Sequence, residues 1–219
     1  LSFFNASVPF YLFSKAALDL EAGTMSVLNG TTPLFSFVIS ILWLRLSSNW
    51  IQFVGILIGI VGLIVFVGYE SLEFTLLPII LCLIASFLYA FSSNFIFQTK
   101  NIDASYLATI TLLLATFMVF PLIFLEKGID LDHSVNVLGS IGLLGFLCTG
   151  LAYMGFVTLI KRTGPVRAST VVLIVPLTGM MWANIFLNET ITSTMLAGCL
   201  LILIGVGLVN FFKEEEAES

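Results

Sequence analysis

The chain contains 219 residues, of which 59% are hydrophobic and 10% are charged, and its formal net charge is -5. Soluble domains carry about 25% charged residues, so this chain lacks the polar surface that a water-soluble globular protein needs. Lipid must therefore solvate much of it. Four of the 13 acidic residues lie in the final six positions. They indicate a solvated tail and identify no binding partner.

Apolar segments follow one another along the whole chain. A membrane-spanning helix needs about 20 mostly apolar residues. Charged residues and turn formers separate eight such segments, which are 1–18, 22–44, 50–69, 74–98, 104–125, 135–160, 165–187 and 191–212. Hydrophobicity does not alternate with a period of two residues, which argues against a transmembrane barrel. The sequence therefore predicts an all-α polytopic membrane protein with eight transmembrane helices.

The cysteines and the first residue add two expectations. Cys82, Cys148 and Cys199 lie within apolar segments and form no CxxC pair, so neither a disulfide framework nor a metal site is expected. The chain begins at Leu1 inside an apolar segment. We therefore expect an N-terminal truncation, with the natural N-terminus further upstream.

Lysine and arginine are distributed unevenly between the two faces of the predicted bundle. Alternating connections place Lys15 and Lys127 on one face. The opposite face receives Arg45, Lys100, Lys161, Arg162, Arg167 and Lys213. Because cytoplasmic loops are enriched in basic residues, the second face is predicted to be cytoplasmic. We expect a multi-pass protein of the cell (plasma or inner) membrane whose C-terminus is cytoplasmic.

Residues 22–65 and 165–208 match one another without a gap at an offset of 143 positions. Pro33 matches Pro176 at this offset, and the matched glycines are Gly55 with Gly198 and Gly62 with Gly205. The chain crosses the membrane five times between equivalent positions, and an odd number of crossings inverts the second copy. Inverted repeats are typical of membrane transporters.

The repeat predicts a bundle of ten helices, five in each copy. On this interpretation, residues 1–69 hold the last three helices of the first copy and residues 74–212 hold the complete second copy. Residues 213–219 form an acidic cytoplasmic tail. The first two helices of the bundle are expected upstream of this chain.

Both copies are similar to the EamA domain of the drug/metabolite transporter superfamily. In the first copy the resemblance is carried by EAGTMSVLNGTTPLF (21–35) and QFVGILIGIVGLIVF (52–66), and in the second by GPVRAS (164–169) and LNETIT (187–192). The glutamate usual after the proline-containing helix is Glu189, but the first copy has Leu46 there. The resemblance implies a ten-helix carrier of small organic solutes.

Polar and aromatic side chains inside apolar helices are the candidates for a substrate cavity, because each needs a partner there. These candidates are Tyr11, Asn29, Thr32, Tyr89, Ser93, Asn94, Tyr153 and Trp182. Hydrogen bonding between neighbouring helices is the alternative role of such residues. Aromatic groups with sparse polar groups would suit a neutral or zwitterionic solute.

The positions of proline and glycine predict where helices bend and where they pack closely. Pro33 and Pro176 remove a backbone hydrogen bond, which predicts a kink in each helix. Either a gating role or simple packing explains such kinks. Small residues let helices approach closely in lipid, which predicts helix packing at Gly55, Gly59, Gly62, Gly198 and Gly205.

The leading functional hypothesis is an integral membrane transporter of small organic metabolites, such as amino acids, that works by alternating access. An intramembrane enzyme is disfavoured, because His133 lies in an acidic loop and histidine or carboxylate clusters at depth are missing. A non-transporting assembly or sensor subunit is the alternative. We expect a small-molecule solute and the lipid bilayer as partners, no nucleic acid and no cofactor, while a homodimer is an open option.

Overall fold

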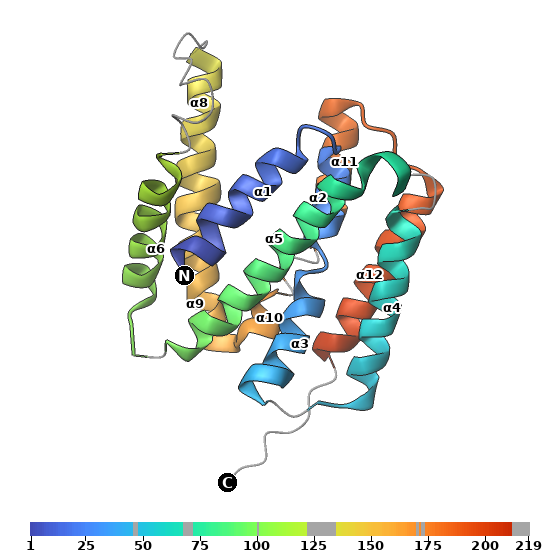
Figure 1. Ribbon diagram of the computed structural model, residues 1–219, viewed down its shortest axis with the longest axis horizontal. Coiled ribbons are helices and arrows are strands. Elements are labelled where there is room, and N and C mark those ends of the chain that lie inside the picture. Colours follow the sequence, from blue (N-terminus) through green and yellow to red (C-terminus); the bar gives the residue numbers. More distant parts are fainter. Residues whose placement is uncertain are drawn as a thin grey trace.

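A computed structural model describes residues 1–45, 48–67, 72–99, 101–121, 135–169, 171 and 174–211. All regular elements within these ranges are helices. In chain order they are η1 (Phe3–Ser7), α1 (Val8–Ala16), α2 (Ala22–Asn29), α3 (Thr32–Leu44), α4 (Trp50–Val67), α5 (Leu72–Gln98), α6 (Ala104–Val119), α8 (Val135–Leu143), η2 (Leu144–Leu151), α9 (Ala152–Thr163), α10 (Pro165–Ala168), α11 (Ile174–Leu187) and α12 (Ser193–Phe211). Figure 1 shows α4 beside α12 on one flank and α6 with α8 and α9 on the other, while α1, α3 and α5 lie between them.

Five stretches of helix within the described residues are long and apolar enough to cross a membrane. They are Ala22–Leu44, Trp50–Val67, Leu76–Gln98, Val137–Thr163 and Ser193–Asn210. Two predicted segments correspond to shorter apolar helices, Ala104–Val119 and Ile174–Leu187, and residues 1–18 form η1 and α1. The regular elements of the described residues are therefore all helical, and their lengths and composition are those of a multi-pass membrane protein. The acidic loop with His133 and the tail at 213–219 lie outside the described residues.

Helices α4 and α12 pack with their backbones in contact. A Cβ atom added at Gly55 would lie 2.7 Å from the Gly205 carbonyl oxygen, and one added at Gly62 would lie 2.9 Å from the Gly198 carbonyl oxygen. A Cβ at Gly59 would lie 2.5 Å from the Leu34 side chain in α3. Because the order of contacts reverses along α12, the two helices are antiparallel. All five glycines of the sequence analysis lie in this contact region.

The two prolines begin helices, which differs from the kinks that the sequence predicts. Pro33 is the second residue of α3 and Pro176 is the third residue of α11. The first amides of a helix have no acceptor within it, so a proline there removes no hydrogen bond. The segment 22–44 instead breaks between α2 and α3, at Gly30 and Thr31.

Helix α2 lies close against α11. A Cβ at Gly30 would lie 2.6 Å from the Pro176 ring. One turn before Gly30 in α2 and one turn after Pro176 in α11, a Cβ at Gly179 would overlap the Ser26 side chain. Small side chains thus allow these two helices to make close contact across the bundle.

Helix α5 is held to α3 by a buried polar cluster. The Ser40 hydroxyl donates to Asn94 Oδ1 at 2.7 Å, and Asn94 Nδ2 donates to the Ser36 hydroxyl at 3.1 Å. Asn94 and Ser36 are fully buried. Each polar atom that leaves water here gains a partner, so the cluster fixes the position of α5 against α3.

Two charged groups hold the turn between α5 and α6. The Asp103 carboxylate accepts hydrogen bonds from the backbone amides of Tyr106 and Ser105, at 3.0 and 2.9 Å, and so caps α6. The Lys161 ammonium donates to the Thr99 carbonyl at 2.8 Å. The amide hydrogen bonds, with the nearby Lys161 charge, hold the pKa of Asp103 below its usual range.

Candidate functional site

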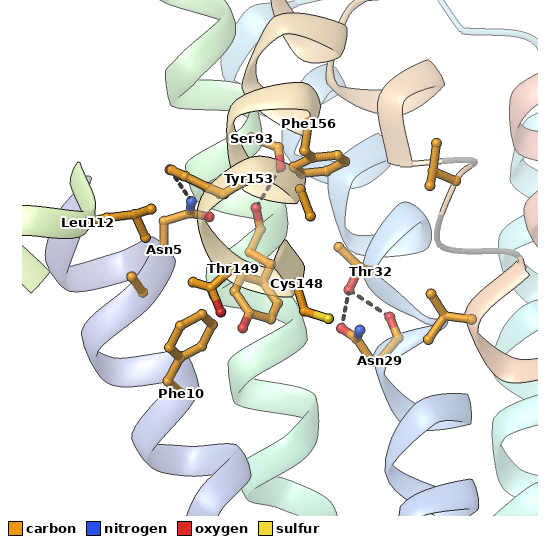
Figure 2. Close-up of a pocket in the computed structure, with 15 residues that line it drawn as sticks. Asn5, Phe10, Asn29, Thr32, Ser93, Leu112, Cys148, Thr149, Tyr153 and Phe156 are labelled. Carbon is orange, nitrogen blue, oxygen red and sulfur yellow. Dashed lines mark hydrogen bonds between the residues drawn. The ribbon is translucent and has the colours of Figure 1, made fainter. Parts of the chain in front are cut away.

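A cavity of about 350 Å³ lies among η1, α1, α5, α6, η2 and α9, beside the end of α2 and the first residues of α3 and α11 (Figure 2). Small-molecule sites usually have volumes from about 300 to 1,000 Å³, so a small organic solute fits here. The lining residues are Asn5, Ala6, Phe10, Asn29, Thr32, Tyr89, Ser93, Leu112, Cys148, Thr149, Ala152, Tyr153, Phe156, Val171 and Val175.

Irregular helix geometry brings several of these side chains to the cavity. Asn5 and Ala6 belong to the π-helical turn η1, and Cys148 and Thr149 belong to the π-helical turn η2. Departures from α-helical geometry are frequent at functional sites. In a membrane such irregular backbone is tolerated where it faces protein or a cavity.

The polar groups at the cavity come from different helices. Asn5 Nδ2 donates to the Tyr153 hydroxyl, which links η1 to α9 (Figure 2). The Thr32 hydroxyl donates to the Asn29 carbonyl oxygen at 2.7 Å across the break between α2 and α3. The Ser93 hydroxyl donates to the Tyr89 carbonyl oxygen at 2.9 Å. Amide and hydroxyl groups can therefore both donate to and accept from a solute.

Aromatic rings form the rest of the wall. Phe10, Tyr89, Tyr153 and Phe156 all line the cavity. The Tyr89 ring is in turn stacked on Phe13, with ring centroids 6.0 Å apart. None of the described residues that line the cavity is charged. A neutral solute, or a zwitterion whose charges pair with dipoles, matches these walls better than an ion with a net charge.

Five of the eight candidate residues meet at this cavity, namely Asn29, Thr32, Tyr89, Ser93 and Tyr153. The other three lie elsewhere. Tyr11 faces away on α1, where the Lys15 ammonium lies 5.5 Å from its ring centroid. Asn94 belongs to the buried α3–α5 cluster. Trp182 is 51% exposed, and its ring is stacked on Phe186 with centroids 5.4 Å apart.

Sequence reasoning missed several lining residues, above all Asn5, Phe10, Cys148, Thr149 and Phe156. Asn5 carried the same signal as the chosen candidates, because it is a lone amide in an apolar segment. Phe10 could have been found from the repeat, since it precedes Tyr153 by 143 positions. Cys148 and Phe156 carry no signal that separates them from ordinary apolar residues of the bundle.

Comparison with known proteins places the chain among membrane transporters. Residues 1–68 and 76–211 match the model of a family described as "EamA-like transporter family". A protein of Archaeoglobus fulgidus named "Uncharacterized transporter" is 26% identical over 212 residues, which are 95% of this chain and 75% of the relative. The Bacillus subtilis protein named "Uncharacterized transporter YoaV" is 25% identical, over 88% of this chain and 68% of its own length.

Two further comparisons concern a named activity and the fold. A Salmonella typhimurium protein named "Probable amino-acid metabolite efflux pump" is 26% identical over 92% of this chain and 71% of its own length. A solved crystal structure superimposes with a TM-score of 0.68 at 13% sequence identity, over 92% of this chain and 71% of the solved one. That likeness concerns the fold alone. The family match covers nearly the whole chain, and the chain therefore belongs to the EamA-like transporter family.

Proposed function

We propose that this protein is a membrane carrier that moves small neutral or zwitterionic solutes, such as amino acids, through the cavity by alternating access. One observation carries the proposal: lining residues form pairs that are 143 positions apart. The pairs are Asn5 with Cys148, Ala6 with Thr149, Phe10 with Tyr153, and Thr32 with Val175. A cavity built from equivalent positions of two repeats lies on the axis that relates them, where a carrier needs its substrate site.

The contact between α4 and α12 supports an inverted repeat. The contacting pair Gly55 and Gly205 corresponds, at the 143-residue offset, to the contacting pair Gly198 and Gly62. Two antiparallel helices that exchange places in this way are related by a two-fold axis. On this interpretation the two units lie within residues 1–69 and 74–212, with eight membrane crossings between them. Two interconverting states, each open to one side, follow from that symmetry.

The orientation of the carrier rests on its basic residues. Arg45 is the C-cap residue of α3, and Lys161, Arg162 and Arg167 lie in the last turns of α9 and α10. The sequence places all four on the same face, since the connections between crossings alternate between the two faces. We assign this face, and with it the C-terminus, to the cytoplasm because basic residues are enriched in cytoplasmic loops. Glu189 and the α2 N-terminus then belong to the outer face.

The class of solute rests on the walls of the cavity. The described lining residues supply aromatic rings, amides and hydroxyls without a charged group. The name of the Salmonella relative, "Probable amino-acid metabolite efflux pump", supports an amino acid or a derivative of one. An amino acid joins a zwitterionic backbone to a side chain that the aromatic wall can contact.

Solute flux across a membrane tests this proposal. The purified protein in liposomes is loaded with unlabelled amino acids and then given each radiolabelled amino acid outside. We expect counterflow of at least one of them and no counterflow in empty liposomes. Absence of counterflow across a panel that also includes neutral metabolites would contradict the proposal and favour a non-transporting subunit.

A further inference from the structure

The N-terminus of α2 is capped by a carboxylate from the opposite end of the chain. Glu189, which follows α11, accepts hydrogen bonds from the Ala22 amide at Oε1, 2.8 Å away, and from the Gly23 amide at Oε2, 2.9 Å away. The first amides of a helix have no acceptor within it, and a negative charge is favourable there. The adjacent Glu21 is the N-cap residue of α2, but its side chain makes no capping bond.

The segment around Glu189 is shaped to present this carboxylate. Asn188 adopts the left-handed backbone conformation with φ of 56°, which asparagine tolerates better than most residues. Asn184 Nδ2 donates to the Glu189 carbonyl oxygen at 2.8 Å, and the Glu189 amide donates to the Ala183 carbonyl oxygen at 3.3 Å. The chain therefore turns back at the end of α11, toward α2.

From Glu189 toward the cavity, α2 and α11 contact one another through small residues, and we call this contact the α2–α11 seam. A Cβ at Gly23 would lie 3.6 Å from Ala183 Cβ, the Ser26 side chain contacts Gly179, and Gly30 contacts Pro176. The seam ends beside the cavity, because Asn29 and Val175 line it. The α2–α11 seam thus lies between the cavity and the face of the bundle that carries Glu189.

The second repeat has different residues at the positions that form this cap. The position equivalent to Ala22 is Pro165, which has no amide hydrogen to donate, and the position equivalent to Glu189 is Leu46, whose side chain cannot accept a hydrogen bond. The contact between α10 and α3 that corresponds to the α2–α11 seam therefore cannot form these two charge-assisted bonds. The two faces of the bundle therefore differ in the hydrogen bonds that must break when each face opens.

We propose that Glu189 is a positioning residue that holds the α2–α11 seam closed and biases the carrier toward the state sealed on the Glu189 face. Opening that face separates α2 from α11 and breaks both carboxylate hydrogen bonds, whereas Pro165 and Leu46, at the equivalent positions of the other face, cannot form them. The inference rests on the proposed alternating access. It goes further by naming one residue that sets the resting state.

Accessibility of the seam tests the inference without any transported solute. In a Cys148→Ser background, Ser26→Cys places a thiol in the seam, and a membrane-impermeant maleimide is added from the Glu189 face. We expect Glu189→Gln to raise the labelling rate about tenfold, because an amide cannot accept both hydrogen bonds; tenfold corresponds to about 1.4 kcal/mol. The matched control is Glu21→Gln, which removes the same charge beside the same helix and should leave the rate unchanged.

Two further variants and a transport measurement separate gating from loss of fold. Glu189→Asp keeps a carboxylate and should return the labelling rate toward that of the wild type. In Glu189→Gln, a larger open fraction should lower the apparent KM for an amino acid supplied at the Glu189 face and raise it at the opposite face. A loss of fold would lower flux from both faces and would not be rescued by aspartate.

The outcomes distinguish this inference from the proposed function. An unchanged labelling rate in Glu189→Gln, or the same increase in Glu21→Gln, overturns the role of Glu189 whether or not flux is found. A labelling rate that depends on Glu189 in a protein without flux supports the role of Glu189 in holding α2 against α11 and contradicts only the proposed carrier function.

Discussion

Asn5 and Tyr153 lie 148 positions apart in the sequence, yet one hydrogen bond joins them at the cavity wall. Asn5 is only 4% exposed, so the amide has exchanged water for the tyrosine hydroxyl. Such a pair positions two helices and also offers a solute a polar contact, because an amide and a hydroxyl retain further donor and acceptor capacity. At the scale of residues, the cavity is an aromatic and apolar pocket with a few amide and hydroxyl groups in its wall.

The Tyr153 hydroxyl provides the first prediction. Tyr153→Phe removes the acceptor of the Asn5 amide while keeping the aromatic wall. A hydrogen bond between this hydroxyl and the solute would contribute about 0.5–1.5 kcal/mol, so we expect the KM for a transported amino acid to rise about twofold to twelvefold. Initial-rate counterflow measures it. Tyr11→Phe is the matched control, because Tyr11 lies one position from Phe10 but does not line the cavity; equal effects of both changes would refute the assignment.

Among elements, the pair α4 and α12 depends on glycine more than any other contact described above. A Cβ at Gly205 would lie 2.5 Å from the Gly55 carbonyl oxygen and 2.6 Å from the Gly59 amide nitrogen. Both neighbours are backbone atoms, which cannot rotate away as a side chain can. Helices that approach so closely gain dispersion energy along their whole length, which matters in lipid because apolar burial from water is absent there.

Gly205→Ala is therefore predicted to separate α4 from α12 and to destabilise the protein by about 1–3 kcal/mol, the usual cost of overpacking. Thermal unfolding in detergent, followed by tryptophan fluorescence, measures the change. Gly155→Ala is the control, since a Cβ at Gly155 meets no atom within 4 Å among the described residues. That variant should keep or slightly raise the unfolding temperature, because alanine favours a helix over glycine. Equal unfolding temperatures for both variants would show that the contact does not need glycine.

The cap of α6 makes a prediction about pH. Because amide hydrogen bonds lower the pKa of Asp103 in the folded protein, its contribution to stability is present above the unfolded pKa and is lost as pH falls through the folded value. Asp103→Ala should lower the unfolding temperature at pH 7. The difference from the wild type should begin to shrink as pH falls below 3.8, the ordinary value, and should vanish below the lower pKa of the folded protein. Asp19→Ala, outside a helix start, is the control. A difference that persists unchanged at low pH would rule out the carboxylate cap.

For the whole molecule, the offset pairs at the cavity and the glycine contacts between α4 and α12 are two separate observations that support the proposed inverted repeat. Two structural repeats that face opposite ways can exchange conformations, which converts one open state into the other. Cys148 is a suitable position at which to measure that change of conformation. It is exposed and lines the cavity, whereas Cys82 and Cys199 are buried.

We therefore predict that a membrane-impermeant maleimide labels Cys148 in the wild-type protein mainly from one face at a time. A transported amino acid should slow this labelling, because it occupies the cavity, and mass spectrometry would report modification at Cys148 over Cys82 and Cys199. Labelling that is equally fast from both faces, and insensitive to every solute tested, would argue for a permanently open or non-transporting protein.

Periodicity and composition were sufficient to predict the structural class of this protein. The all-helical membrane class follows from the excess of apolar residues, because only helices or closed barrels satisfy the backbone in lipid. The resemblance carried by segments such as GPVRAS and LNETIT predicted the family, and the match over residues 1–68 and 76–211 confirms it. Ser93 and Asn94 show where such reasoning ends. They are neighbours on α5, yet Ser93 lines the cavity and Asn94 bonds to α3, and nothing in the sequence says which helix faces each one.

The sequence by itself determined that this chain is a helical membrane protein of the EamA-like family and that its two copies match at an offset of 143 positions. Those properties depend on residue type and spacing along one chain. Only the tertiary structure decided that Asn5 meets Tyr153, that the prolines begin helices, and that Glu189 caps α2. Each of these depends on which helices pack together, and packing in lipid is decided by close shape fit between distant segments.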